Sequence, residues 1–239
     1  YLKRCIIGGF DPVYEIGRLF RNEGMDTTHN PEFTTIEFYE AYTDVNGMME
    51  RTEGLMKHVC QKVNGTMELP FGDVVIDMGA PFRRATMVEL VKEHCGVDFD
   101  QITDLEGAIA VDKEHKIKVE KKHKWGDIVA LFFEEYCEAK LIQPTFIYDY
   151  PVENSPLAKR KPENPLFTER FEYFINCTEY GNAFSELNDP IDQRERFERQ
   201  VAERKAQDPE CKAQVDYDYI TALEYGMPPT GGLGFGVDR

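Results

Sequence analysis

The sequence has no pair of cysteines at metal-ligand spacing. Its six cysteines are scattered along 239 residues, and none of them forms a CxxC pair. The five histidines do not stand at spacings that would complete a zinc site with them. This usage is typical of a reduced, cytoplasmic protein with buried thiols, and it argues against a disulfide framework or a structural zinc site.

Long apolar runs and an excess of positive charge are lacking too. No segment approaches the roughly 18 uninterrupted apolar residues of a membrane helix, and the first residues do not resemble a signal peptide. The chain has 28 Lys and Arg residues against 44 Asp and Glu residues, a net charge of −16. A broad nucleic-acid-binding surface is not expected, because neutralising phosphates requires clustered Lys and Arg. The basic run 116–124 is a local exception, and a solvated helix or turn is its simpler interpretation.

The composition favours a folded globular protein. Apolar residues make up 41% of the chain and aromatic residues 12%, which suits a packed core rather than a disordered chain. A chain of 239 residues can form one sizeable core, or one domain that carries an insertion. The chain does not begin with methionine and its last residues read as interrupted, so we expect a fragment of a longer protein.

Hydrophobic patterning predicts an α+β fold with an antiparallel sheet flanked by helices. Extended segments are expected at 13–20, after Phe33, and at 74–76, 146–148, 170–175 and 179–187. Helices are expected after Asp44, Thr86 and Asp189, which are residue types that cap a first turn. The region 85–142 reads as a helical insertion. Long helices do not alternate with single strands, so a doubly wound parallel sheet is not expected.

The most informative stretch runs over 21–42. A long polar loop reaches from Arg21 to Phe33, and loops of this length in a compact domain are usually either functional or disordered. After the loop, alternation places Glu37 and Tyr39 on one face of a strand, near the arginine. A carboxylate, a phenol and a guanidinium could together bind a substrate that carries an ammonium and a phosphate. Taken singly, however, charged loop residues are more often merely solvated.

Glycines occupy every second position near the end of the chain, within 231–239. In a strand this spacing leaves one face without side chains, so that a flat ligand could lie on the backbone, although simple packing is an equal alternative. The spacing lacks GxGxxG and no βαβ unit follows, so it is not a dinucleotide fingerprint.

Acidic side chains are dense on two neighbouring extended segments. Glu172 stands on the first, and Glu179 and Glu186 stand on the second together with Asn182. Carboxylates this close repel one another unless a cation joins them, and hard oxygen ligands of this kind suit magnesium. A solvated acidic edge is the alternative.

Three stretches together resemble the class II aminoacyl-tRNA synthetases. Residues 20–34, with Arg21-Asn22-Glu23 opening the loop, resemble the second signature motif of the class and are most similar to its lysyl-tRNA synthetase family. Residues 231–239 resemble the third motif, whose closing arginine lies against ATP. Residues 170–189 resemble the segment of the lysyl family that holds magnesium and lysine, with one departure, Cys177, where glycine is expected.

The resemblance implies ATP-dependent activation of L-lysine and its transfer to tRNA(Lys), with Mg²⁺ as cofactor. It implies that Arg21 and Arg239 are catalytic and that Mg²⁺ is held by Glu172 and Glu179. The residues implied to bind ATP are Arg21, Glu23, His29, Asn30, Phe33 and Arg239. Those implied to bind L-lysine are Glu37, Tyr39, Asn182 and Glu186. Catalysis of this kind rests on positioning and electrostatics, so the lack of a Ser-His or Cys-His pair agrees with it.

The resemblance covers nearly all of 1–239 as part of a class II catalytic domain, and is weakest over 85–142. It implies a cytoplasmic homodimer without membrane contact, whose anticodon-binding domain lies outside this chain. Two alternatives stay open. One is a paralogue that activates lysine but transfers it to a protein or a lipid. The other is a synthetase-like module that binds lysine or nucleotide without catalysis, against which the presence of Arg21 and Arg239 argues.

Overall fold

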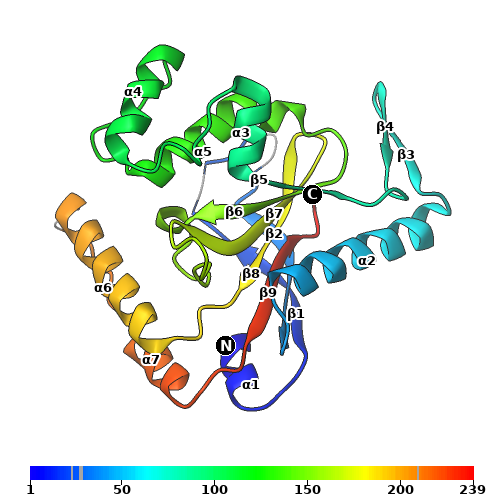
Figure 1. Cartoon of the computed structure of the whole chain (residues 1–239). Coiled ribbons are helices and arrows are strands. Elements are labelled where there is room, and N and C mark those ends of the chain that lie inside the picture. Colours follow the sequence, from blue (N-terminus) through cyan, green and yellow to red (C-terminus); the bar gives the residue numbers. More distant parts are fainter. Residues whose placement is uncertain (23, 27–28, 209) are drawn as a thin grey trace.

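The computed structural model describes residues 1–22, 24–26, 29–208 and 210–239 (Figure 1). Its large sheet consists of β1 (Val13–Phe20), β2 (Glu32–Ala41), β5 (Arg83–Thr86), β6 (Thr145–Pro151), β7 (Phe167–Ile175), β8 (Thr178–Ser185) and β9 (Thr230–Gly236). The spatial order is β1-β2-β9-β8-β7-β6-β5, and only the β5–β6 pair among these neighbours is parallel. A separate hairpin is formed by β3 (Glu68–Phe71) and β4 (Val74–Asp77). The predicted antiparallel sheet is therefore confirmed, with one parallel strand at its edge.

Helices surround this sheet in Figure 1. They are α1 (Leu2–Ile7), α2 (Val45–Asn64), α3 (Met87–Cys95), α4 (Leu105–His115), α5 (Trp125–Tyr136), α6 (Pro190–Gln207) and α7 (Tyr217–Glu224), with short 3₁₀ turns at Glu138–Lys140 and Val152–Asn154. The predicted caps are confirmed, because the side chains of Asp44, Thr86 and Asp189 each accept hydrogen bonds from backbone amides of the first turn. None of the helices in the described part of the chain has the length and apolarity needed to cross a membrane.

The region 85–142 starts inside β5 and carries α3, α4 and α5 before the chain re-enters the sheet at β6. Parallel neighbours cannot be joined by a tight hairpin, so a long crossover is required here. The sequence predicts a helix that ends before Gly96 and a further helical stretch to about Lys140, and the structure divides this second stretch into α4 and α5. Gly96, with φ of 81°, ends α3, and Lys116, with φ of 59°, ends α4. The basic run that follows Lys116 is a turn rather than a helix.

The middle of the sheet is buried on both faces. Phe146 on β6 packs with Met48 of α2 and Phe171 of β7 in one core. The next residue, Ile147, packs with Phe132 of α5 in the other core. Alternation along β6 thus directs neighbouring side chains into opposite cores. The helices α3 and α5 cover their face only over β5–β7, which leaves the same face open over β2, β9 and β8.

Arg196 fixes α6 next to this open face. The many charged and few apolar residues of α6 predict a surface helix, and Ile191 is indeed exposed, but Arg196 is buried. Its guanidinium donates to the carbonyl oxygens of Ser155 (3.1 Å) and Ala158 (2.9 Å) and pairs with Asp192 at 2.7 Å. Ala158 in turn forms a β-bridge with Glu186, so α6 supports the backbone of a predicted lysine-binding residue.

Candidate active site

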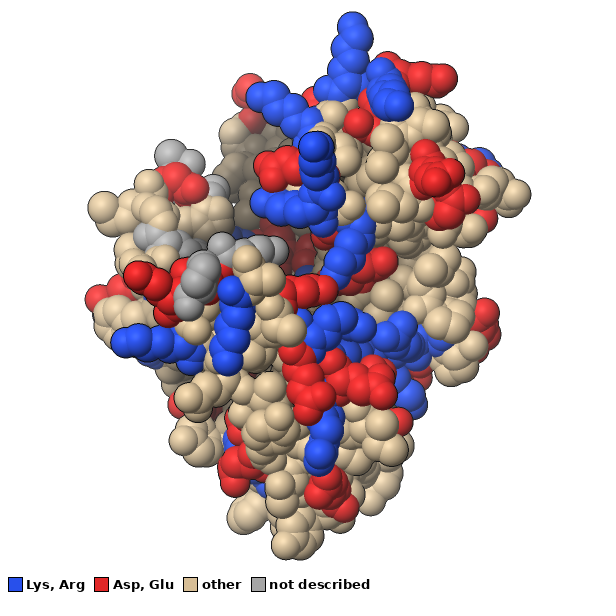
Figure 2. All heavy atoms as spheres, turned by 90° about the vertical axis from the view of Figure 1, so that its left-hand side faces the viewer, with Lys and Arg blue, Asp and Glu red and all other residues tan. Residues whose placement is uncertain are grey.

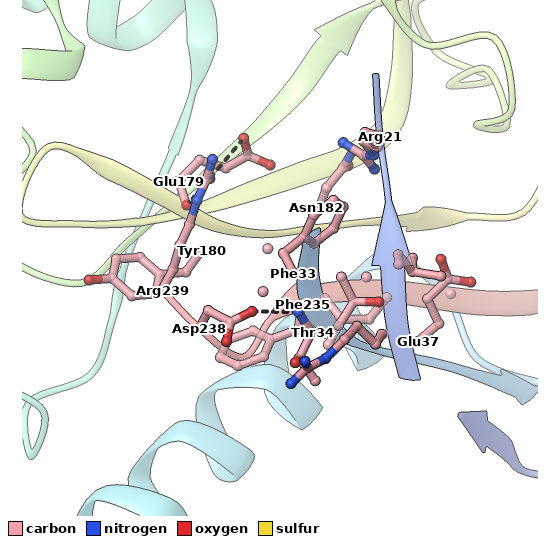
Figure 3. Close-up of a pocket in the computed structure, with 18 of the residues that line it drawn as sticks. Arg21, Phe33, Thr34, Glu37, Glu179, Tyr180, Asn182, Phe235, Asp238 and Arg239 are labelled. Carbon is pink, nitrogen blue, oxygen red and sulfur yellow. Dashed lines mark hydrogen bonds and ion pairs between the residues drawn. The ribbon is translucent and has the colours of Figure 1, made fainter. Parts of the chain in front are cut away.

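A pocket of about 930 Å³ opens on the face of the sheet formed by β2, β9 and β8 (Figure 3). Its lining includes these predicted site residues: Arg21, His29, Asn30, Phe33, Glu37, Tyr39, Glu179, Asn182, Glu186 and Arg239. Glu172 does not line the pocket, and the predicted ATP-binding residue Glu23 lies outside the described residues. Segments from both ends of the chain therefore meet in one cavity.

The pairing register explains why these side chains meet. Directly paired residues of neighbouring antiparallel strands point to the same face of a sheet. One such row crosses four strands through Glu37, Gly234, Asn182 and Glu172. The next row passes from Tyr39 through Gly232 to Phe184. The prediction that Glu37 and Tyr39 share a face is confirmed.

The glycine strand β9 forms the floor of the pocket, and its glycines differ in what they make room for. A Cβ atom on Gly234 would meet only the carbonyl oxygen of Asn182, at 3.9 Å, so the backbone there is open to a ligand. A Cβ atom on Gly232 would collide with the carboxylate of Glu186 and come within 2.6 Å of the Tyr39 ring. The side-chain-free face of β9 is thus open at Gly234, whereas at Gly232 it is covered by the side chains of Glu186 and Tyr39.

Two guanidinium groups lie on different sides of one end of the pocket (Figure 3). The guanidinium carbon of Arg21 lies 5.2 Å from the centroid of the Phe33 ring. Arg239 donates to the backbone carbonyl of Glu179 at 2.6 Å, and its other terminal nitrogen lies 3.4 Å from Nε2 of His29. Delocalised cations held in this way match the oxygens of a phosphate chain, and the aromatic ring between them offers a stacking surface.

Asp238 holds the end of β9 against β2, because its carboxylate accepts a hydrogen bond from the backbone amide of Thr34 (Figure 3). His29 is oriented by Asp26, whose carboxylate lies 2.9 Å from Nδ1 and accepts from the backbone amide of His29 at 2.7 Å. Both contacts fix loop residues of the arginine end. Asp238 also lines the pocket and is a further residue of this site that sequence patterns did not predict.

The opposite end of the pocket is acidic and aromatic. Glu186 is 2% exposed, and its burial raises the pKa of the carboxyl from an ordinary 4.5 to about 7, partly offset by Lys3. The Tyr39 hydroxyl donates to Glu37 at 3.4 Å, and burial raises the pKa of Tyr39 so that the phenol stays neutral. Two carboxylates and a hydroxyl oxygen are the acceptors that an alkylammonium group needs when it leaves water.

A carboxylate pair flanks the arginine end. Glu172 accepts hydrogen bonds from Arg170 (2.6 Å) and Tyr150 (2.7 Å). Burial, and then the negative charge of Glu172, raise the pKa of Glu179 to about 7. The described residues contain no group of three or more His, Cys, Asp or Glu that could hold a metal by itself. The pair still fits Mg²⁺, which usually takes one or two carboxylates and completes its shell with phosphate oxygens and water.

Two further pocket residues extend the set of predicted side chains. Phe184 lies between Asn182 and Glu186 on β8 and its continuation, and period-two alternation places all three side chains on one face. Lys3 reaches the pocket from α1. No periodicity or motif could have placed Lys3, because α1 contacts β2 only through the folded topology.

Basic side chains gather locally on the surface despite the acidic composition of the chain. Figure 2 shows Lys and Arg side chains gathered beside a hollow in one face of the molecule, although the net charge of the chain is −16. Local basic side chains can therefore contact phosphates without a basic overall composition.

Comparison with known proteins gives consistent results. The family model described as tRNA synthetases class II (D, K and N) matches residues 1–239. The chain is 57% identical over 240 residues to the lysine–tRNA ligase of Streptococcus suis and 56% identical over 239 residues to that of Thermoanaerobacter pseudethanolicus, in each case over 100% of this chain and 48% of the relative. It is 57% identical over 242 residues to the lysine–tRNA ligase of Clostridium acetobutylicum, over 100% of this chain and 47% of the relative. The chain thus spans about half the length of the curated relatives that it matches.

Proposed function

The chain belongs to the class II tRNA synthetases of the D, K and N group, and from this membership we propose that it forms part of the catalytic domain of a lysine–tRNA ligase. In the proposed reaction, L-lysine and ATP form lysyl-adenylate and pyrophosphate, and the lysyl group then passes to tRNA(Lys). The protein at full length would act in the cytoplasm as a homodimer, with its anticodon-binding domain outside this chain.

One observation carries the proposal: the pocket is cationic at one end and anionic at the other. Arg21 and Arg239 line one end, while the buried Glu186 and the half-buried Glu37 line the other. An ATP molecule needs the first kind of environment and a lysine side chain needs the second. Lys3 pairs with Glu186 at this end, so a neutral amino acid would leave one of the two carboxylate charges without a partner, which is costly in a pocket.

The residues of the arginine end would stabilise the transition state in which lysyl-adenylate forms. The lysine carboxylate attacks the α-phosphorus of ATP, a new P–O bond forms, and the bond to pyrophosphate breaks. Arg21 would bind the α-phosphate, where negative charge concentrates in the transition state. Phe33 would stack on adenine, and Arg239 would hold the other ring face or the γ-phosphate.

The remaining predicted residues would position the substrates. His29, Asn30 and Glu23 would orient the nucleotide, while Tyr39 and Asn182 would help to hold lysine. No side chain has to act as a nucleophile, because the carboxylate of lysine already is one. Glu172 and Glu179 would hold Mg²⁺, which neutralises phosphate charge when it is bound.

The deciding experiment is amino-acid-dependent ATP–pyrophosphate exchange on the protein at full length, with each standard amino acid in turn. We expect exchange with L-lysine alone. Arg21→Ala should lower kcat at least about a hundredfold, because it removes a donor aimed at charge that develops in the transition state.

Arg18→Ala is the matched control, since Arg18 also lines the pocket but pairs with Glu32 at the surface, at 2.5 Å. Its exchange rate should stay within a fewfold of the unmodified protein. Absence of exchange with every amino acid, in a folded protein, would refute the proposed activity. Exchange with lysine but no charging of tRNA(Lys) would instead point to a protein or lipid acceptor.

A further inference from the structure

Lys3 places its own ammonium group in the acidic end of the pocket. Its Nζ atom lies 2.6 Å from Oε2 of Glu186, and its side chain is only 15% exposed. Glu186 is among the most buried charged residues of the described chain, at 2% exposure. A carboxylate this deep is stable in its charged form only with a partner, and Lys3 supplies one.

Aromatic rings complete the surroundings of this ammonium. The Nζ atom lies 5.7 Å from the centroid of Tyr39 and 5.4 Å from that of Phe184. Both distances are within the range in which a cation is attracted to the face of a ring. Lys3 is therefore held by Glu186, Tyr39 and Phe184, which all line the pocket.

Glu186 keeps acceptor capacity after this pairing. Its buried oxygens have no partner with hydrogen-bond geometry among the described residues, even though Lys3 lies within ion-pair distance of Oε2. Lys3 thus compensates the charge of Glu186 at Oε2 and leaves the other oxygen without a partner among the described residues. Oε1 in particular remains a buried acceptor inside the pocket.

The charged side chains described at this end of the pocket do not cancel one another. Glu37 and Glu186 contribute two negative charges and Lys3 contributes one positive charge, so one negative charge is left over. A side chain with a single ammonium group brings the sum to zero, whereas without Lys3 it would leave one buried carboxylate uncompensated. The charge deficit therefore matches one ammonium.

We propose that Lys3 is a specificity-determining residue of the amino-acid pocket: its ammonium balances Glu186, so that the pocket presents one uncompensated carboxylate charge to the incoming side chain. This inference rests on the proposed lysine-activating function. It assigns Lys3 a role in binding rather than in the transfer step, since Lys3 lies at the end away from the arginines.

The proposal predicts a particular pH dependence. The groups that face Glu186 are Lys3 from α1, Glu37 and Tyr39 from β2, and Tyr219 from α7. Of these, Lys3 alone is a cation and it lowers the pKa of Glu186, so without it Glu186 would keep its proton to a higher pH. Lysine binding would then have to release that proton.

The test is Lys3→Met in the protein at full length, which keeps the length of the side chain and removes its charge. In ATP–pyrophosphate exchange, the rising limb of kcat/KM for lysine against pH should move up by at least about one pH unit, which is a tenfold loss on that limb. Lysine binding by calorimetry in buffers of different ionisation enthalpy should release more protons than in the unmodified protein. The KM for ATP should not change.

Two control variants separate charge from packing. Lys3→Arg keeps the positive charge and should retain the original pH profile. Arg4→Met removes a neighbouring cation on α1 that pairs with Asp218 at 2.7 Å, away from the pocket, and should leave the lysine KM unchanged.

Each outcome distinguishes this inference from the proposed function. If the unmodified protein exchanges with lysine but Lys3→Met keeps the original pH profile and proton release, the inference is wrong while the function stands. A lower lysine KM in Lys3→Met at every pH would also overturn it, because Lys3 would then be a competitor of the substrate. No lysine-dependent exchange by the unmodified protein would remove the function itself.

Discussion

Gly232 lies where two side chains of the acidic end of the pocket come together. It pairs with Tyr39 across β2 and with Phe184 across β8, so any side chain at this position would point into the pocket. The absence of a Cβ atom allows Glu186 and the Tyr39 ring to occupy the space above the backbone. Residue-scale specificity thus depends on a position that contributes no functional group.

Gly232→Ala should weaken lysine binding. The added methyl group would collide with Oε1 of Glu186 and come within 2.6 Å of Cε1 of Tyr39, so both side chains have to shift. We expect the lysine KM to rise at least about tenfold, since displacement by one methyl group is worth about 1–3 kcal/mol in a fitted pocket. The KM for ATP should change less than about twofold, because the arginine end is not touched.

Gly54→Ala is the matched control for this substitution. Gly54 lies on α2, and a Cβ atom there would meet nothing within 4 Å. Alanine at an exposed helix position should be neutral or stabilise the fold by up to about 1 kcal/mol. Equal lysine KM values for the Gly232 and Gly54 variants would contradict the packing argument.

The hairpin of β7 and β8 carries both carboxylates of the predicted magnesium site, Glu172 and Glu179, and Asn182 of the predicted lysine site. Its turn consists of Asn176 and Cys177, which have φ of 47° and 62°. A two-residue turn with both residues in the left-handed region suits the twist of a hairpin and favours glycine at the second position. The departure from the family pattern at Cys177 therefore falls on a residue that holds a conformation better suited to glycine.

Cys177→Gly should stabilise the hairpin. A residue with a Cβ atom in the left-handed region costs about 1 kcal/mol or more, and glycine removes that cost. Hydrogen exchange of the β7 and β8 amides should slow accordingly, by about fivefold for 1 kcal/mol in the local opening equilibrium. The substitution also removes the contact of the thiol with the carbonyl of Ala139 (3.3 Å), which reduces the gain slightly.

Cys177→Ala separates these two effects, because alanine loses the thiol but keeps the Cβ atom. We expect no slowing of amide exchange in this variant. If alanine and glycine protect the hairpin equally, the backbone conformation of the turn is not the cause.

Short-range patterns predicted the individual elements well, and long-range pairing explains what they missed. Caps at Asp44, Thr86 and Asp189 marked three helix starts because capping depends on a few consecutive residues. Alternation predicted the shared face of Glu37 and Tyr39 for the same reason. The parallel edge strand β5 and the position of Lys3 beside Glu186 depend on contacts between distant segments, which local periodicity does not encode.

At the scale of the whole molecule, the net negative charge and the buried Glu186 both make the folded protein less stable as the pH rises. The chain carries a net charge of −16, so self-repulsion grows as the remaining carboxyls ionise. Glu186 has a pKa raised from 4.5 to about 7 in the folded state, so the folded protein binds this proton more tightly than the unfolded chain does. The contribution of this group to the free energy of unfolding is therefore fully present at low pH. It is lost, by about 3 kcal/mol at most, as the pH rises from about 4.5 to about 7.

Lysine should reverse part of this loss. At about pH 8 Glu186 is ionised and an ammonium can bind directly, whereas at about pH 5.5 a proton must first leave Glu186. We therefore expect saturating L-lysine to raise the melting temperature of the protein at full length more at pH 8 than at pH 5.5. L-norleucine has the same carbon chain as lysine but lacks the side-chain ammonium group, and it should produce almost no shift in melting temperature at either pH. An equal shift by lysine at both pH values would mean that Glu186 does not titrate in this range, and a shift by norleucine would mean that the acidic end does not select for charge.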